Sequence, residues 1–361
     1  IKDAVNIPVF IGHNVFTPED AERLLEEGVG DYVALGRSQL ADPCWAKKAK
    51  EGKAEDIKPC INCLIGCLDR GLLSHTPIHC TVNPTLHKFE GPEITPAEEQ
   101  KNVAVVGAGP AGSEAALTLA KRGHKVTIFE KRDFGGAMIE ASVPDNKSNI
   151  RRLIQYYKNH IEANDAITIV KEEADFDKIA NGGFDAVILA IGGKTRKLKV
   201  AEDGKNTLIY ANDYLNGSKK AIGDKVVVIG GGITGAETAL ELKNEGKDVT
   251  IVEMADQFLA SNSSACQAYS ISISQTDIKI ITGKRLVAAE NGNAVVMDRW
   301  GNTTELEADS IVIAAGFMPQ YELAEQLENE TELEVYNVGD SKQVRQIYDA
   351  IHEGFVAARQ I

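Results

Sequence analysis

Four of the six cysteines lie in one short stretch and could together bind a metal ion or a metal cluster. They are Cys60, Cys63, Cys67 and Cys80, with two, three and twelve residues between successive members. Four thiolates at one place bind either zinc or an iron–sulfur cluster. Zinc ribbons usually carry two separate C-x2-C pairs, whereas three close cysteines and a distant one suit a cubane cluster wrapped by a loop. The spacing therefore favours a [4Fe–4S] cluster, with zinc as the alternative.

The two other cysteines, Cys44 and Cys266, stand apart from this spacing. We expect Cys44 to be buried in a core and Cys266 to be a lone structural cysteine. Six cysteines in 361 residues are too sparse for a disulfide scaffold.

A glycine-rich fingerprint occurs twice, and each copy has the spacing of a dinucleotide-binding turn. The first copy consists of Gly107, Gly109, Gly112 and Glu130. The second copy, 123 residues later, consists of Gly230, Gly232, Gly235 and Glu253. Each copy follows an apolar strand-like run, opens a helical pattern and has its acid 18 residues after the last glycine, which is the full context of a Rossmann site. The pyrophosphate would bind at the helix N-terminus, and the acid would accept hydrogen bonds from ribose hydroxyls.

The second copy also indicates which nucleotide it takes. Glu253 would repel the 2′-phosphate of NADP, and the following Met254 and Ala255 offer no cation for that phosphate. We therefore expect NADH rather than NADPH at this site.

Two further apolar runs, at residues 186–193 and 311–316, are expected to be strands that end at a glycine, and residues 335–340 are expected to form a strand followed by a helix. Glycine at a strand end lets the backbone approach a ligand closely. Asp340, between the last strand and a helix expected from about Val344, could bind a cofactor hydroxyl or be an ordinary N-cap.

The first 45 residues have the pattern of one βαβ unit with parallel strands. Strand-like runs at 7–12 and 32–35 flank a helical run whose expected N-cap is Thr17, with Pro18 at the first helical position. Gly12, Gly36 and Arg37 follow the two strands. Glycine amides and a bidentate arginine would suit the phosphate of FMN, although a generic βαβ piece fits equally well. Residues 46–100 show little regular pattern and include a polar linker at 90–96.

In these motifs and their order, the chain resembles the old yellow enzyme-like iron–sulfur flavoenzymes. That group includes 2,4-dienoyl-CoA reductase, 2-enoate reductases, and trimethylamine and histamine dehydrogenases. The resemblance covers essentially the whole chain, from the βαβ unit through the cysteines to both fingerprints. It implies an α/β fold in four parts. Residues 1–50 would be the C-terminal fragment of an FMN-binding (β/α)8 barrel, and residues 51–100 a [4Fe–4S] segment and linker. Residues 101–210 and 316–361 would form an FAD domain, with an NAD(H) domain at 211–315 inserted in it.

The resemblance also implies which residues hold each cofactor. FMN is assigned to Gly12, Gly36 and Arg37; FAD to Gly107, Gly109, Gly112, Glu130, Gly339 and Asp340; NADH to Gly230, Gly232, Gly235 and Glu253; and the cluster to Cys60, Cys63, Cys67 and Cys80. Gly136 is expected among the cofactor-binding residues as well. No catalytic residue is expected in this portion, because the family's substrate acid/base residues lie on barrel strands that this sequence lacks. Disulfide reductase chemistry is excluded, since Cys266 is the one cysteine after Cys80.

The expected function is NADH-dependent reduction of an activated alkene, an enoate or enoyl-CoA, with electrons passing from NADH through FAD, the cluster and FMN. An amine dehydrogenase of the trimethylamine or histamine type is the alternative within the family, but its second fingerprint is free to decay, whereas both are intact here. An electron-transfer module without its own substrate site and a non-catalytic nucleotide-binding regulator are further alternatives.

Composition excludes several other classes. A net charge of −14 makes the chain a poor partner for nucleic acid or an anionic membrane surface. The sequence contains no run of 18 apolar residues, so we expect no membrane-spanning helix, and its start has no signal-peptide pattern. We expect a cytoplasmic homo-oligomer with a small-molecule substrate. The sequence begins with Ile1 rather than Met and lacks barrel strands 1–6 that the resemblance implies, so we also expect it to be the C-terminal portion of a longer protein.

Overall fold

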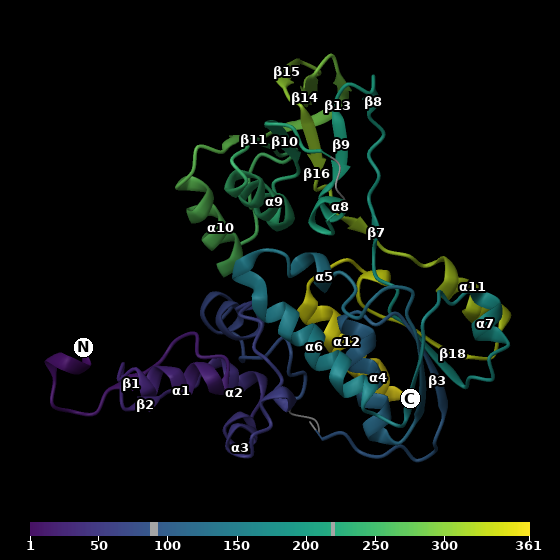
Figure 1. Ribbon diagram of the computed structural model, residues 1–361. Helices are drawn as coiled ribbons and strands as arrows, with labels where there is room; N and C mark the ends of the chain where they lie inside the picture. The colour runs from purple at the N-terminus through teal and green to yellow at the C-terminus, as the bar shows by residue number, and fades with distance from the viewer. Residues whose placement is uncertain (87–92, 218–220) are drawn as a thin grey trace. The chain divides into compact units, whose positions relative to one another are not determined.

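The computed structural model describes residues 1–86, 93–217 and 221–361, which form two compact units (Figure 1). Unit 1 contains residues 1–138, 147–192 and 319–361, and unit 2 contains residues 139–146 and 193–318. In the described ranges, no helix has the length and apolar composition needed to cross a bilayer. Of the expected linker at 90–96, residues 90–92 lie outside the described residues.

A parallel five-stranded sheet forms the centre of unit 1, with strand order β18-β6-β3-β4-β5. The strands are β3 (Asn102–Val106), β4 (Lys125–Phe129), β5 (Ile167–Val170), β6 (Ala186–Leu189) and β18 (Glu334–Asn337). The helices of this unit's sheet domain are α4 (Pro110–Arg122), α6 (Ser148–Glu162), α7 (Phe176–Ala180), α11 (Glu322–Glu330) and α12 (Ile347–Gln360). All four residues of β6 are buried, which explains its unbroken apolar run.

Helices α4 and α12 pack closely because a glycine lies where they meet. A Cβ atom on Gly354 of α12 would come within 2.9 Å of the carbonyl carbon of Ala111 on α4. The helix begins at Ile347 rather than near Val344, and Gln346 and Asp349 form a capping box at its start.

The N-terminal part of unit 1 is the expected βαβ unit, in a shortened form. Strands β1 (Phe10–Ile11) and β2 (Tyr32–Val33) pair in parallel around α1 (Pro18–Glu26). The hydroxyl of Thr17 accepts the backbone N–H of Asp20, so the predicted N-cap is confirmed. Two short helices follow, α2 (Arg37–Ala41) and α3 (Trp45–Lys50).

The cysteine segment contains a helix that the sequence pattern did not predict. After a short 3-10 turn at Ala54–Asp56, residues Ile65–Leu73 form a π-helix. Leu64, which precedes this helix, and Asn62 both adopt left-handed backbone conformations, with φ of 62° and 55°. Such conformations are uncommon for residues other than glycine. They let the chain reverse direction tightly between Cys60 and Cys67.

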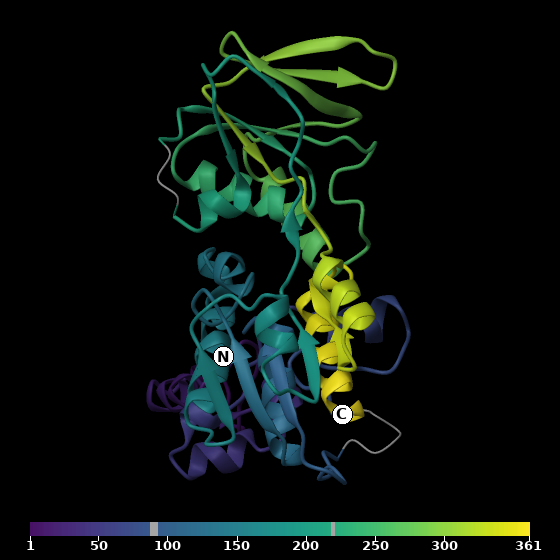
Figure 2. The same ribbon diagram turned by 90° about the vertical axis from the view of Figure 1, so that its right-hand side faces the viewer.

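Unit 2 repeats the arrangement of unit 1's sheet and adds an antiparallel meander, whose green strands are prominent in Figure 2. Its parallel sheet has the order β12-β11-β10-β16-β9, with β9 (Thr207–Tyr210), β10 (Lys225–Ile229), β11 (Asp248–Val252), β12 (Lys279–Ile281) and β16 (Ser310–Ile313). The second sheet has the order β15-β14-β13-β8, with β8 (Ala201–Glu202), β13 (Lys284–Glu290), β14 (Asn293–Asp298) and β15 (Thr303–Glu307). The strands β7 (Lys194–Thr195) and β17 (Phe317–Met318) form a separate pair. The helices are α8 (Ala211–Leu215), α9 (Ile233–Asn244) and α10 (Ser264–Ser274), while α5 (Met138–Ala141) spans the division between the units.

The repeat in the sequence is therefore also a repeat in the fold. Strands β10 and β11 occupy the places in unit 2 that β3 and β4 occupy in unit 1, at the same offset of 123 residues. In both units a glycine-rich turn connects the first of these strands to a helix, so the two fingerprints lie at equivalent positions.

Candidate cofactor-binding sites

The first fingerprint forms a tight turn between β3 and α4. Gly107 has a φ of 102°, which side chains rarely adopt, and its amide donates to the carbonyl of Phe129 at 2.8 Å. A Cβ on Gly107 would lie 3.0 Å from the carbonyl carbon of Ala190, and one on Gly112 would collide with the carbonyl oxygen of Gly107. Gly109 is the N-cap of α4. The turn thus presents helix N-terminal amides with no side chain in front of them, which is what a pyrophosphate needs.

Three more predicted residues lie around the same turn. A Cβ on Gly136 would lie 2.9 Å from the Cα of Gly109, and one on Gly339 would lie 3.3 Å from the Cβ of Ala111. Asp340 follows directly, but it is not the N-cap of α12. Its Oδ1 accepts the backbone N–H of Arg345 at 3.0 Å, and burial raises the pKa of its carboxyl group.

Glu130 ties this turn to the end of β4. Its Oε2 accepts the backbone N–H of Ala108 and its Oε1 accepts that of Arg132, each at 2.7 Å. The side chain is buried. A carboxylate has about four lone-pair sites, so it can also accept hydrogen bonds from ribose hydroxyls.

The second fingerprint has the same geometry in unit 2. Gly230 has a φ of 116°, Gly232 is the N-cap of α9, and a Cβ on Gly235 would collide with the carbonyl oxygen of Gly230. Glu253 accepts the amides of Gly231 at 2.5 Å and Ala255 at 2.7 Å. Both acids therefore hold their glycine turns, a role that the sequence pattern did not indicate.

The four clustered cysteines line one cavity in unit 1. The other lining residues are Arg37, Leu40, Ile61, Leu64, Gly66, Thr81 and Val82. No carboxylate lies among them, and in the described part of the chain no three His, Cys, Asp or Glu side chains form a group that could hold a single metal ion. The sulfurs are thus arranged around a space rather than gathered at one point.

Burial and backbone hydrogen bonds compete at these thiols. Burial raises the pKa of Cys60, Cys63 and Cys80 to about 11. Backbone amides act in the opposite direction: the N–H of Asn62 donates to Cys60 Sγ at 3.4 Å, and those of Val82 and Asn83 donate to Cys80. A free thiolate is therefore disfavoured at these cysteines. If a bound metal replaces the thiol protons, backbone amides already donate to the sulfurs.

The cysteines come together because two backbones approach closely. A Cβ on Gly66 would lie 2.8 Å from the carbonyl oxygen of His79 and 3.2 Å from the carbonyl carbon of Cys80. The π-helix that carries Cys67 can therefore lie against the strand-like segment before Cys80 only with glycine at position 66. The glycine between Cys63 and Cys67 was the sequence signal for this contact.

The three residues predicted for an FMN phosphate lie just after the two strands of the βαβ unit. Gly12 and Gly36 follow the two paired strands, and a Cβ on either would meet no atom within 4 Å. The guanidinium of Arg37 donates to the side-chain oxygens of Asn14, at 2.8 Å, and Asn62, and it borders the cysteine cavity.

A buried ion pair that the sequence analysis missed joins the cysteine segment to α4. Lys58 Nζ lies 2.6 Å from Glu114 Oε2, and the hydroxyl of Tyr157 on α6 donates to the same oxygen at 2.8 Å. The two charged side chains are only 14% and 9% exposed. Burial raises the pKa of Tyr157, so its hydroxyl stays a donor.

The two remaining cysteines differ from each other in burial. Cys266 is buried beside Ala236 and Leu259 on unit 2, as predicted. The prediction for Cys44 was wrong, since this residue is exposed. It lies at the N-terminus of α3, where the next residue, Trp45, is the one that packs into the core.

Two glycine turns of the dinucleotide-binding type, each on a parallel α/β sheet, are typical of oxidoreductases with two dinucleotide folds. The chain belongs to the pyridine nucleotide-disulphide oxidoreductase family, whose model matches residues 101–351. Membership implies binding of FAD and NADH. The described fold contains no partner for a redox disulfide within that range, because Cys266 is the one cysteine there.

Comparisons with known proteins confirm the resemblance to the 2,4-dienoyl-CoA and 2-enoate reductase group. The chain is 37% identical to an NADH oxidase of Thermoanaerobacter brockii and 32% identical to a cinnamate reductase of Clostridium sporogenes; the alignments cover all of this chain and 56% and 54% of those proteins. A solved 2-naphthoyl-CoA reductase complex superposes with a TM-score of 0.89 at 31% identity, over 100% of this chain and 55% of that one. The chain thus spans about half the length of the relatives it matches.

Gly235 and Gly232 of the second fingerprint differ in the space around them, so substituting each by alanine should have a different effect. We expect Gly235→Ala to destabilise unit 2 by about 2 kcal/mol or more, because its Cβ would overlap the carbonyl oxygen of Gly230. Gly232→Ala is the matched control, since its Cβ would meet no atom within 4 Å. It should leave thermal unfolding unchanged but weaken NADH binding about tenfold, because it faces the pyrophosphate position. Equal thermal stability of the two variants would contradict this account.

The buried pair gives a second prediction. Glu114→Ala should lower the free energy of unfolding by about 3–5 kcal/mol, because it leaves the Lys58 ammonium buried without a partner. The double variant Lys58→Met/Glu114→Leu should recover most of that loss. Denaturant unfolding measures both, and Glu51→Ala, which breaks an exposed pair with Lys53, should have little effect. A double variant as unstable as Glu114→Ala would show that the pair itself is not what matters.

Proposed function

We propose that this chain is the C-terminal portion of an NADH-dependent reductase of activated alkenes, either enoates or enoyl-CoA thioesters. The proposal rests chiefly on one observation: four cysteines line one cavity in the same compact unit as the first nucleotide-binding turn. When bound, the cofactors would supply hydride transfer from NADH to FAD, single-electron transfer through a [4Fe–4S] cluster to FMN, and hydride transfer to the alkene.

The chain's own residues would bind and orient these groups. The amides at the start of α4, beyond Ala108 and Pro110, would donate to the FAD pyrophosphate, and Glu130 and Asp340 would accept from its hydroxyls. The amides at the start of α9, beyond Gly231, and the carboxylate of Glu253 would do the same for NADH. Since Glu253 already accepts two backbone amides, its charge is fixed beside the ribose position, which supports a preference for NADH over NADPH.

The cavity supports an iron–sulfur cluster over zinc. Zinc needs four ligands within about 2.3 Å of one point, and the described residues form no such group. A cluster instead needs thiolates around a space, each bound to a different iron, with amide donors and apolar walls around the sulfurs. Cys60, Cys63, Cys67 and Cys80 would be the ligands, and Leu64, Ile61 and Val82 would exclude water.

The N-terminal βαβ unit supports a larger barrel. Two paired strands alone are marginally stable, and Phe10 and Tyr32 stack at 4.9 Å while they remain 67% and 54% exposed. Further strands of a (β/α)8 barrel would cover these rings. We propose that FMN binds beside Gly12 and Gly36 in such a barrel, with Arg37 between that site and the cysteine cavity.

The function predicts a specific cofactor content and reactivity. Full-length protein purified without oxygen should contain FAD, FMN and about four irons per chain. NADH should bleach its flavin absorbance and support reduction of an α,β-unsaturated acid or thioester, and NADPH should do so more slowly. Absence of FAD, or flavin absorbance that NADH leaves unchanged, would refute the proposal.

Variants of the two glycines in the π-helix can distinguish the role of the cluster from the roles of the other cofactors. We expect Gly66→Ala to lose most of its iron, because the added Cβ pushes the helix away from His79 and Cys80. Alkene reduction should fall with the iron, while NADH-dependent reduction of an artificial dye by FAD persists. Gly71→Ala is the matched control on the same helix, since its Cβ meets only Ile78 at 3.6 Å, an ordinary contact. Alkene reduction by iron-depleted Gly66→Ala at the wild-type rate would exclude the cluster from the electron path.

A further inference from the structure

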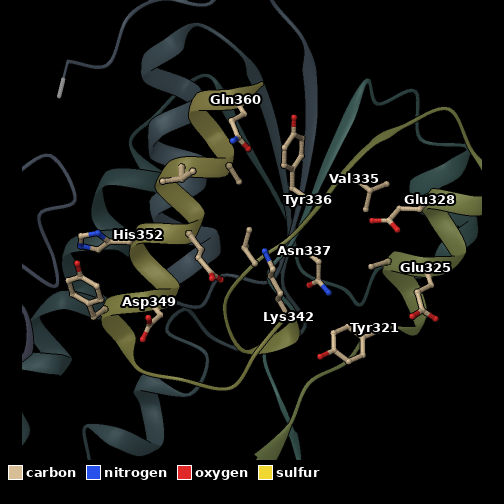
Figure 3. A pocket seen from close by; sticks show the side chains of 16 residues that line it. Tyr321, Glu325, Glu328, Val335, Tyr336, Asn337, Lys342, Asp349, His352 and Gln360 are labelled. Atoms are coloured by element: carbon tan, nitrogen blue, oxygen red, sulfur yellow. The ribbon is translucent and has the colours of Figure 1, made fainter. Parts of the chain in front are cut away.

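A groove in unit 1 borders the cysteine segment, since its lining residue His352 contacts the carbonyl of Cys80, but it contains none of the glycines or cysteines predicted to bind cofactors. Its floor is strand β18, and its walls are the helices α11 and α12 (Figure 3). It has a volume of about 690 Å³, within the range of ligand-binding clefts. The function proposed above assigns nothing to this groove.

The floor of the groove is an open sheet edge. Strand β18 pairs with β6 on one side, and no described strand pairs with its other side. The amide of Glu334 donates to the carbonyl of Asp185, just before β6, and that of Val338 donates to Leu189 at the end of β6. Because alternate residues of a strand direct their backbone groups to opposite edges, the N–H and C=O of Val335 and Asn337 lie on the open edge. Such an edge is a template for one more strand.

A buried acceptor on the floor supports the same conclusion. The side-chain oxygen of Asn337 is buried and has no hydrogen-bond donor within the described part of the chain. Its amide nitrogen donates only a long bond, 3.4 Å, to the carbonyl of Ser341. An unsatisfied buried acceptor is costly, so the floor of the groove is incompletely hydrogen-bonded in this chain.

The walls carry an excess of negative charge. On α11, Glu325 and Glu328 are exposed and form no ion pair with the residues that the structure describes. On the opposite wall, Arg345 holds both Asp349, at 3.4 Å, and Glu353. Among the residues that line the groove, Lys342 stands against four carboxylates, and Figure 3 shows Glu325 and Glu328 on one side and Asp349 on the other.

We propose that this groove binds an extended, basic peptide segment of a partner protein, added as a further strand on the open edge of β18. The backbone of the segment would pair with Val335 and Asn337, and lysine or arginine side chains would reach Glu325 and Glu328 on the wall. The rings of Tyr321 and Tyr336, which also line the groove, offer faces for these cations. A second copy of this chain is a poorer occupant, because its net charge is −14.

The test uses full-length protein and two labelled nonapeptides, one that alternates lysine with valine and one with glutamate in place of lysine. Fluorescence anisotropy should show binding of the lysine peptide alone, with affinity that falls as salt rises. Hydrogen exchange at residues 334–338 should slow when it binds. Val335→Pro removes an edge N–H without removing a bond to β6, and it should weaken binding about tenfold. Glu325→Gln/Glu328→Gln should weaken it about fivefold.

The matched control is Glu22→Gln/Glu26→Gln, which removes the same two charges from the exposed face of α1. It should leave peptide affinity unchanged. Equal losses in the control and in Glu325→Gln/Glu328→Gln would reduce the interaction to general attraction by an acidic surface and overturn the proposal. Self-association that Val335→Pro abolishes, or full protection of 334–338 in the absence of peptide, would show that another part of the protein already covers the edge, and would overturn it too.

Discussion

The close contact between helix α4 and the end of strand β3 is the constraint on which the rest of unit 1 depends. It exists because Gly112 lies directly against the carbonyl of Gly107, where a side chain has no room. Once α4 is fixed at this distance, its N-terminal amides face the space in front of the turn. The same helix then presents Ala111 to α12 and Glu114 to the cysteine segment. One missing side chain thus sets the position of both candidate cofactor sites.

The cysteine segment is held from two sides by this framework. On the α4 side, Glu114 binds Lys58, two residues before Cys60. On the α12 side, a ring nitrogen of His352 lies 3.0 Å from the carbonyl of Cys80, and the rings of His352 and Tyr348 stack at 4.1 Å. Under the proposed function, a cluster in this cavity would need a fixed distance to FAD, and attachment of the cysteine segment to α4 and α12 would provide it.

What could be predicted from the sequence was set by local spacing. The glycines and acids of the two fingerprints act within one turn and one strand pair, so their spacing predicted their geometry. The π-helix at Ile65–Leu73 has no comparable pattern, because it depends on the contact of Gly66 with residues thirteen and fourteen positions later. The Lys58–Glu114 pair joins residues 56 positions apart. Cys44 was misjudged because its burial depends on which side of α3 faces the core, and Trp45 occupies that side.

The duplicated fold shows how one framework acquired two different roles. Glu237 of α9 lies 123 residues after Glu114 and is likewise buried at the same place on its helix. In unit 2 its partner is the hydroxyl of Tyr269 on α10, a contact that together with burial raises the pKa of that tyrosine. In unit 1 the equivalent acid binds Lys58 and Tyr157 instead. A buried carboxylate must be paired wherever it occurs, so the copy that meets the cysteine segment uses its acid to anchor that segment, while the other copy uses it to pack its own helix.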